Sequence, residues 1–322
     1  MRFLFISNYG LETHTSYQNI LIRALQEAGH TVDHLYPRNG PILNQVWDKQ
    51  VKPPDAVIYM EGLLFENPRW LKLPIKIPKI WYFLDTPVLF NEQVMWYNIT
   101  DADLALVRDR REIPKFEEQG IKCVWAPPKI NPKTFHIYPC ERRDIDVGFV
   151  GYVNESRARW LDDFTVVSNS VHGYGDGVKT WNWQETFNNH TYQQKLPHRE
   201  FAEIYSRTKI CPHRTGRYEN TRTKGEGVQG DITWRPFEAT ACGAMLLTEE
   251  FDAIDDLFVR GKEIVVYDMN NDPRDRVELA KYYLERDEER EKIAKAGYDR
   301  THKDHTWSSI IELLVSSVKR HV

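Results

Sequence analysis

The sequence predicts an α/β protein with two Rossmann-like lobes that face each other across a cleft. Short apolar segments alternate with amphipathic helical segments along the first half of the chain. The alternation stops in the proline-bearing stretch from Pro127 to Cys140 and restarts at the strand-like segment Ile145–Gly151. Because alternating strands and helices form parallel sheets with helices on both faces, each alternating block indicates one lobe.

The first lobe, expected over residues 1–140, is predicted from six short apolar runs. Each run has the length of a buried strand and ends at a polar residue or a turn-forming residue. The predicted strands are Phe3–Ser7, Thr31–Leu35, Ala56–Tyr59, Lys79–Leu84, Leu104–Val107 and Cys123–Ala126. Two helices are predicted between them, at 16–28 and 112–119, and Gly29 and Gly120 end them.

The second lobe, expected over residues 141–305, repeats the pattern of strands and helices. An amphipathic segment follows at Trp307–Val318, and the segment 306–322 is expected to be a C-terminal helix that returns to the first lobe. We place the linker between the lobes at the charged sequence Glu141–Asp144, which follows the proline-bearing stretch.

Composition describes a soluble globular chain of 322 residues, with 41% hydrophobic and 28% charged residues. The formal net charge of −4 gives no global basic field for nucleic acid or anionic membrane, although a local basic groove is compatible with it. The four cysteines lie far apart without a C-x-x-C pair, as reduced thiols in a cytoplasmic protein do. No apolar run approaches the length of a transmembrane helix, and the first residues are too short a run for a signal peptide.

The most informative segment is Trp234–Thr248, which predicts a short helix followed by a buried strand. Pro236 suits the start of a helix, Gly243 suits the residue just past its end, and an apolar run follows at Ala244–Leu247. Arg235 stands just before the helix, at the end where backbone N–H groups and the helix dipole favour an anion such as phosphate. Glu238 in the first turn suits two hydroxyls of a ribose, and it equally suits a capping role.

This segment resembles the donor-binding helix of GT-B glycosyltransferases, in which a Glu-Ala-x-Ala-x-Gly run holds the ribose of a nucleotide sugar. Its Arg-x-Phe-Glu-Ala-x-Ala-Cys-Gly form is most similar to the spore maturation protein CgeB-like group. The resemblance continues through 257–267, 283–297 and His305-Thr-Trp307, and so covers most of the C-terminal half. It implies a GT-B fold, a nucleotide sugar as donor, and a last helix that crosses back to the first lobe.

One position departs from the pattern of that family. Many retaining GT-B enzymes carry a second glutamate about eight residues before the ribose-binding one, and here Gly230 stands there with Asp231 beside it. Either Asp231 takes over that contact, or the donor sugar is held differently. The sugar and the stereochemistry of transfer therefore stay open.

Candidate acceptor-side residues follow strands of the first lobe, where ligands of open α/β sheets bind. Asp85 ends the aromatic strand and precedes Thr-Pro87, and the CgeB-like group carries a similar aspartate-proline end. A carboxylate there suits a general base or an electrostatic stabiliser, and the alternative is a turn-capping residue. Glu12 and His14 follow the first strand and suit contacts with acceptor or donor, the alternative being an ordinary polar loop. Glu61 is a further candidate.

Candidate donor-side residues follow strands of the second lobe. Gly151 and Arg157 resemble the glycine and arginine of the family that approach a diphosphate. Tyr174, in Tyr-Gly after the next strand, resembles the family position near the base. Arg214 and Lys224 belong to a basic, glycine-containing stretch that precedes the key helix. This stretch is expected to contact the donor phosphates or an anionic acceptor, and the alternative is a solvated loop.

We therefore predict a glycosyltransferase that moves a hexosyl or pentosyl group from a nucleotide-diphosphate sugar to an acceptor hydroxyl. Arginine and helix-start charges would neutralise the leaving diphosphate, so neither a metal nor a cofactor is expected. One alternative is transfer to a modified base in viral DNA, and another is a GT-B-like protein that binds a nucleotide or partner without turnover. The acceptor and the oligomeric state are not predicted.

Overall fold

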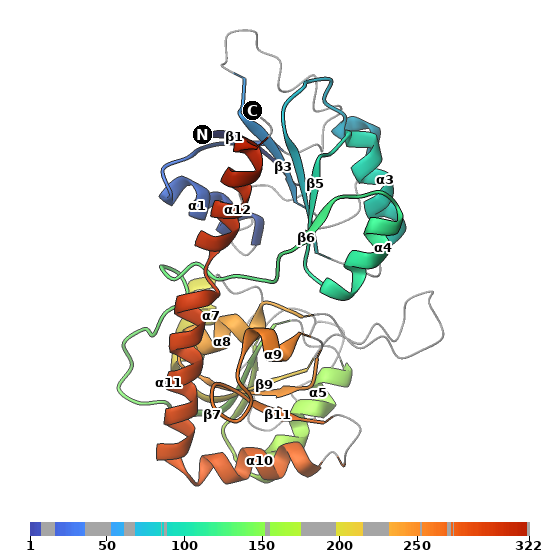
Figure 1. Cartoon of the computed structure of the whole chain (residues 1–322). Helices are drawn as coiled ribbons and strands as arrows, with labels where there is room; N and C mark the ends of the chain where they lie inside the picture. Colours follow the sequence, from blue (N-terminus) through green and yellow to red (C-terminus); the bar gives the residue numbers. More distant parts are fainter. Residues whose placement is uncertain are drawn as a thin grey trace. The chain divides into compact units, whose positions relative to one another are not determined.

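The computed structural model describes residues 1–7, 17–35, 53–60, 68–84, 86, 89–151, 155–174, 198–214, 232–251, 253–268, 272 and 274–320 (Figure 1). The chain divides into two compact units. Unit 1 contains Met1–Pro128 and the C-terminal segment Trp307–Val322, and unit 2 contains Lys129–Tyr218 and Gly227–Thr306. Each unit is built on one parallel sheet, as the alternation of strands and helices predicts.

The sheet of unit 1 has six parallel strands in the order β2-β1-β3-β4-β5-β6. The strands are β1 (Arg2–Ser7), β2 (Thr31–Leu35), β3 (Ala56–Met60), β4 (Lys79–Phe83), β5 (Leu104–Val107) and β6 (Cys123–Trp125). The helices are α1 (Tyr17–Glu27), α3 (Phe90–Thr100), α4 (Ile113–Glu118) and α12 (Trp307–Lys319), with short 3-10 turns at Pro68–Leu71 and Arg110–Glu112. All six strands match the predicted ones to within one or two residues.

Aromatic packing holds one face of this sheet against α3. The Trp81 ring stacks on Tyr59 and on Trp96, with ring centroids 4.8 Å and 5.7 Å apart. The Trp81 indole N–H also donates to Thr100 Oγ1 at 2.9 Å, so the strand and the helix are joined by a hydrogen bond inside the apolar layer. Helix α3 has no strong amphipathic pattern, and the sequence alone did not predict it.

Helix α12 belongs to unit 1 although it comes last in the chain. It contacts α1 (Figure 1). Its first residue, Trp307, packs edge-to-face on Tyr82 of β4 with ring centroids 6.2 Å apart. The buried residues Ile310, Ile311, Leu314 and Val318 form its apolar face. The C-terminal helix therefore returns to the first lobe, as expected for a GT-B fold.

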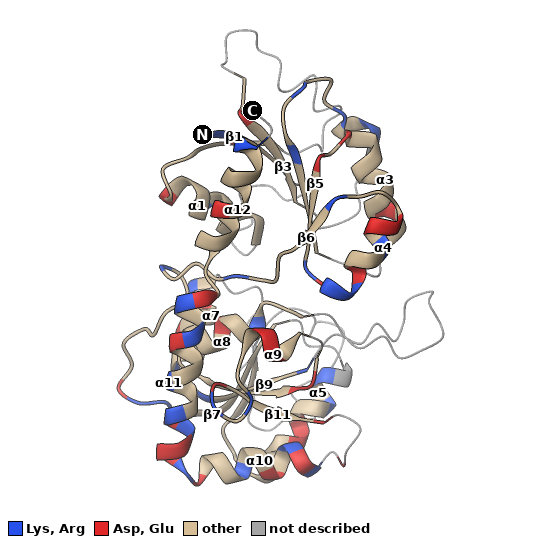
Figure 2. Cartoon of the chain, in the orientation of Figure 1, with Lys and Arg blue, Asp and Glu red and all other residues tan. Residues whose placement is uncertain are grey.

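The sheet of unit 2 has five parallel strands in the order β11-β10-β9-β7-β8. The strands are β7 (Ile145–Val150), β8 (Val171–Tyr174), β9 (Thr208–His213), β10 (Met245–Glu249) and β11 (Val265–Tyr267). The helices are α5 (Glu155–Asp162), α7 (His198–Arg207), α8 (Arg235–Ala241), α9 (Ile254–Leu257), α10 (Arg274–Leu284) and α11 (Asp287–Asp304), with a 3-10 turn at Asp163–Val166. Figure 2 shows charges of both signs interspersed along α10 and α11, so these helices present mixed polar surfaces.

Within the described ranges, the chain passes from one unit to the other at Pro128–Lys129 and at Thr306–Trp307. Within unit 2 the two connecting segments are hydrogen-bonded to each other. Ile130 N–H donates to the His305 carbonyl at 2.9 Å, and Ile130 pairs with Thr306 in a parallel bridge. The linker predicted at Glu141–Asp144 lies within unit 2. Tyr138, just before it, is bound there, since its N–H donates to Ser206 Oγ at 2.9 Å.

Candidate nucleotide-sugar site

The site is built on α8, whose two ends follow from the sequence. Pro236 lies in the first turn, where its missing N–H leaves no helical bond unmade. At the other end Gly243 has a φ of +76°, Gly243 N–H donates to the Thr240 carbonyl, and Ala244 N–H donates to the Ala239 carbonyl. These two bonds form a Schellman motif, which ends the helix and turns the chain into β10. Arg235 is the first helical residue, not the residue before the helix.

Arg235 is a buried arginine with an unused hydrogen-bonding group. Its side chain is 8% exposed, its Nε–H donates to the Val150 carbonyl at 2.8 Å, and its guanidinium carbon lies 4.0 Å above the Phe149 ring. Within the part of the chain that the structure describes, its buried Nη1 has no hydrogen-bond partner. Buried N–H groups are nearly always paired, so this arrangement favours an anionic ligand at Nη1.

Gly151 is required by this arginine. The residue follows β7 with a φ of +145°, and a Cβ placed there would lie 2.2 Å from Arg235 Nη2. The sequence indicates a glycine that lets the backbone approach a diphosphate. In the structure the space that a side chain would take is occupied by the guanidinium group itself.

A second arginine reaches the same aromatic ring. The Arg157 guanidinium carbon, from α5, lies 5.9 Å from the centroid of Phe149. Arg157 and Arg235 therefore converge on the carboxyl end of β7. The chain leaves β7 for β8 on one side of it and β9 lies on the other side, so this is the topological switch point where open α/β sheets bind ligands.

The other sequence candidates of unit 2 lie along the same sheet edge or outside the described residues. Tyr174 ends β8 and its backbone pairs with Val150, while Arg214 directly follows β9, the other neighbour of β7. Lys224 and Asp231 lie outside the described residues. In unit 1, Asp85, Glu12, His14 and Glu61 also lie outside them.

Glu238 is buried in the first turn of α8, at 2% exposure. It lies in electrostatic reach of two buried thiols. Burial raises the pKa of Cys211 to about 12, with Arg235 opposing and Glu238 adding to the shift, and burial and then Glu238 raise the pKa of Cys242. Both cysteines are therefore protonated, as expected for reduced structural thiols.

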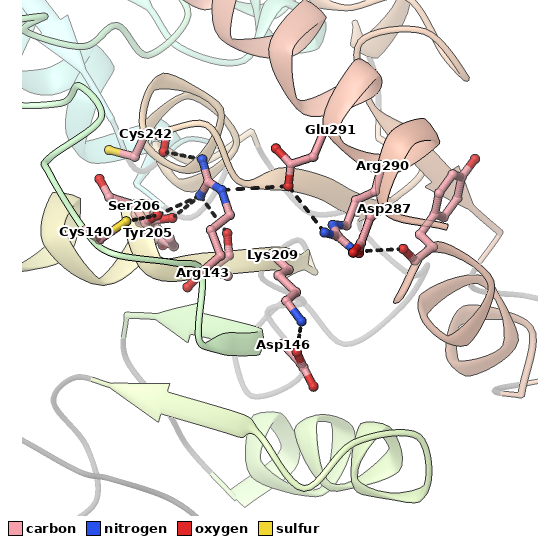
Figure 3. A network of polar contacts seen from close by, with 12 residues as sticks. Cys140, Arg143, Asp146, Tyr205, Ser206, Lys209, Cys242, Asp287, Arg290 and Glu291 are labelled. Carbon is pink, nitrogen blue, oxygen red and sulfur yellow. Dashed lines mark hydrogen bonds and ion pairs between the residues drawn. The ribbon is translucent and has the colours of Figure 1, made fainter. Parts of the chain in front are cut away.

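The carboxyl end of α8 is held by Arg143, which precedes β7 (Figure 3). Its Nη1 donates to the carbonyls of Tyr205, Ser206 and Thr208 at 3.2, 2.8 and 2.9 Å, and its Nη2 donates to the Cys242 carbonyl at 3.5 Å. One cation thus satisfies the carbonyl ends of α7 and α8 together.

Sequence reasoning missed two residues of this site, Phe149 and His213. The guanidinium groups of Arg157 and Arg235 both lie over the Phe149 ring, yet in the sequence Phe149 is one apolar residue of a buried strand. His213 ends β9, is fully buried, and lies between the hydroxyls of Thr248 and Thr233. A histidine as the last residue of a buried strand is the only signal that the sequence offered.

Among the described residues, no cluster of three or more His, Cys, Asp or Glu side chains is arranged to hold a metal ion. Within the same described ranges, no helix is both long enough and apolar enough to span a membrane.

The sequence matches the model of one known protein family. The model of the glycosyl transferase-like family matches residues 154–316, just over half of the sequence. The chain belongs to the glycosyl transferase-like family. No curated protein matches it by sequence.

This glycosyl transferase-like protein is also similar to solved structures along its whole length. HepE from Anabaena in complex with UDP and glucose is 12% identical, with a TM-score of 0.70 over 99% of this chain and 100% of HepE. Alpha-glucosyltransferase in complex with UDP is 13% identical, with a TM-score of 0.66 over 99% of this chain and 100% of that one. The same enzyme in complex with UDP and a 13-mer DNA containing an HMU base gives a TM-score of 0.65 at 13% identity, over 99% of both chains. At these identities the likeness shows the fold, which is that of GT-B glycosyltransferases.

Proposed function

We propose that this glycosyl transferase-like protein transfers a sugar from a nucleoside diphosphate sugar to an acceptor hydroxyl. The observation that carries the proposal is Arg235, a buried arginine at a helix start whose Nη1 has no partner among the described residues. A leaving diphosphate gains most stabilisation from fixed positive charge in a buried site. Arg157, beside the same ring, supports this assignment.

Glu238 is proposed to accept hydrogen bonds from the ribose hydroxyls. It stands three residues after Arg235 in α8, buried at 2% exposure. Tyr174 is proposed to lie near the base and Arg214 and Lys224 near the phosphates, because β8 and β9 flank β7 and Lys224 follows in the same basic stretch. Asp85 is proposed as the acceptor-side base or stabiliser, with Glu12 and His14 as further acceptor-side contacts, from the sequence pattern alone.

The reaction is proposed to need neither a metal nor a cofactor, because the arginines supply the charge that a divalent cation supplies elsewhere. Transfer rates measured with EDTA and with Mg²⁺ or Mn²⁺ test this. Equal rates are expected, and an activity that EDTA abolishes and Mg²⁺ restores contradicts it.

We also propose that the protein belongs to the spore maturation protein CgeB-like group within the family. Support comes from the Arg-x-Phe-Glu-Ala-x-Ala-Cys-Gly sequence over α8, and from the family-like segments that run through β11, α10, α11 and the start of α12.

The first experiment is a thermal-shift screen without metal, using UDP, GDP, dTDP, ADP and CDP and their common sugar conjugates. One nucleoside diphosphate is expected to raise the melting temperature, since a ligand of the native state stabilises it by mass action. Glu238→Ala should weaken binding of that nucleotide about tenfold or more. Glu278→Ala, which removes an exposed glutamate of α10, should leave binding unchanged.

Two outcomes redirect the proposal. Nucleotide binding without transfer to any acceptor favours a binding protein without turnover. No shift with any nucleotide refutes the donor site, and DNA is then the next ligand. Transfer to a modified DNA base is the alternative favoured by the likeness to the DNA-bound alpha-glucosyltransferase, and retention on DNA that weakens steeply with salt supports it.

A further inference from the structure

The buried His213 forms the middle of a chain of hydrogen bonds in unit 2. Its Nδ1 lies 2.8 Å from Thr248 Oγ1, and its Nε2 lies 3.0 Å from Thr233 Oγ1. The ring is fully buried and packs edge-to-face on Phe251, with centroids 6.1 Å apart. Thr248 is the partner of His213 in the register between β10 and β9.

One placement of the protons satisfies all three contacts of this chain of hydrogen bonds. Thr248 has one hydroxyl proton, which it donates to the Glu249 carbonyl at 2.9 Å. Its oxygen is therefore an acceptor for His213, so the imidazole proton is on Nδ1. In a neutral ring Nε2 is then an acceptor, and the Thr233 hydroxyl donates to it.

The surroundings keep this ring neutral. Burial, reinforced by the positive charges of Arg235 and Arg157, holds the pKa of His213 well below its usual range. The backbone is tethered as well, because the Tyr267 hydroxyl donates to the His213 carbonyl at 3.1 Å. The chain of bonds thus has one direction, from Thr233 through His213 and Thr248 to the Glu249 carbonyl.

This chain of hydrogen bonds begins at Thr233, immediately before α8. Thr233 precedes Trp234, which occupies the N-cap position and makes no side-chain capping bond, and Arg235 comes next. Among the described residues, the N-cap position of α8 therefore provides no side-chain cap of the kind that usually holds a helix start in place. The bond from Thr233 to His213 ties this segment to the sheet instead.

We propose that His213 is a positioning residue, which anchors Thr233 to β10 and so holds the start of α8, with Arg235, against the end of β7. This inference rests on the proposed function, in which Arg235 binds the donor diphosphate. His213 itself does not contact the reacting atoms in this scheme, and its effect on binding passes through Thr233.

Matched substitutions separate the two ends of the imidazole. In His213→Asn the amide N–H replaces Nδ1–H toward Thr248 and nothing accepts from Thr233, whereas His213→Gln reaches the position of Nε2 with an amide oxygen. Thr233→Val removes the other partner of the bond. His213→Asn and Thr233→Val should each weaken UDP binding about threefold to tenfold by calorimetry, and His213→Gln should restore most of the loss.

The double variant His213→Asn/Thr233→Val should bind UDP no more weakly than either single variant, because both remove the same bond. The control is Thr301→Val in α11. It removes the 2.7 Å hydroxyl contact with Thr240 of α8, and should lower the melting temperature while UDP affinity stays unchanged.

A spectroscopic signature tests the assignment without any ligand. In protein labelled with ¹⁵N-histidine, His213 should show the Nδ1–H tautomer and no titration between pH 8 and pH 5. Unchanged UDP affinities in both single variants overturn the proposal. An Nε2–H tautomer or an imidazolium at pH 7 overturns the direction assigned to the bonds. Failure of the wild-type protein to bind any nucleoside diphosphate is a different result, which refutes the donor site itself.

Discussion

Gly151→Ala tests whether the arginine-filled space beside β7 matters for donor binding. An added Cβ would lie 2.2 Å from Arg235 Nη2 and 3.3 Å from its guanidinium carbon, whereas ordinary contacts begin at 3.4 Å. The guanidinium group must therefore shift, although the 2.8 Å bond to the Val150 carbonyl and the Phe149 ring hold it in place. The backbone is strained too, because φ is +145°.

Two costs add in this variant. Loss of a hydrogen bond from a charged donor costs about 1.5–3 kcal/mol, and a residue held in a sparsely populated backbone region costs about 1–3 kcal/mol. We expect a loss of roughly 3 kcal/mol or more in unfolding free energy. UDP affinity should fall about tenfold or more, because the displaced guanidinium no longer presents Nη1 to the diphosphate.

The matched control is Gly261→Ala in the same unit. Gly261 has a φ of +70° and nothing within 4 Å of an added Cβ, so this variant carries backbone strain without a clash. It should lose about 1–2 kcal/mol of stability and keep its UDP affinity. Calorimetric titration with UDP and thermal unfolding measure both quantities. A folded Gly151→Ala protein that binds UDP as tightly as the wild type refutes the role assigned to Arg235.

Two further predictions concern the supports of the fold. Arg143→Met leaves the carbonyl ends of α7 and α8 without their shared donor, and should cost about 2–4 kcal/mol in a denaturant titration. Arg207→Met, which breaks an exposed pair with Asp144, should cost about 1 kcal/mol or less, and equal losses would contradict the role of Arg143. His305 is buried with its Nε2–H on the Leu257 carbonyl and its Nδ1 3.5 Å from Lys129 Nζ, and burial, then Lys129, lowers its pKa from 6.5 to about 4. Below pH 6.5 the imidazole of His305 is protonated in the unfolded chain, but in the folded chain it stays neutral down to about pH 4. The free energy of unfolding should therefore fall by up to roughly 3 kcal/mol as the pH drops from 6.5 to 4. His305→Gln should make this fall smaller. If the stability of the wild type and of His305→Gln depended on pH in the same way, His305 would be charged or exposed in the folded protein.

Much of the fold could be predicted because it is encoded locally. The apolar runs of the first lobe became β1 to β6, and Pro236 and Gly243 set the two ends of α8. Periodicity and turn chemistry act over a few neighbouring residues, so one sequence suffices to detect them. Helix α3 escaped prediction because polar residues take part in its buried face. Gln93, Trp96, Tyr97 and Thr100 are buried at helical spacing, but two of the four are polar, so the hydrophobic residues form no amphipathic repeat.

The candidate site was predicted in part. Arg235, Glu238, Gly151 and Arg157 were named from spacing and family resemblance, and they stay predictions for donor binding until the variants are measured. The sequence determined that a helix start with an arginine follows the basic stretch, because capping and glycine signals are local.

Only the tertiary structure decided that two guanidinium groups lie over the Phe149 ring and that Gly151 makes room for Arg235. The same holds for the hydrogen bonds by which His213 joins Thr233 to Thr248. These contacts join β7, β9, β10 and the start of α8, which lie far apart in the chain. Parallel strands bring their carboxyl ends to one edge of a sheet, and the partners that meet there depend on strand order, which no local pattern records.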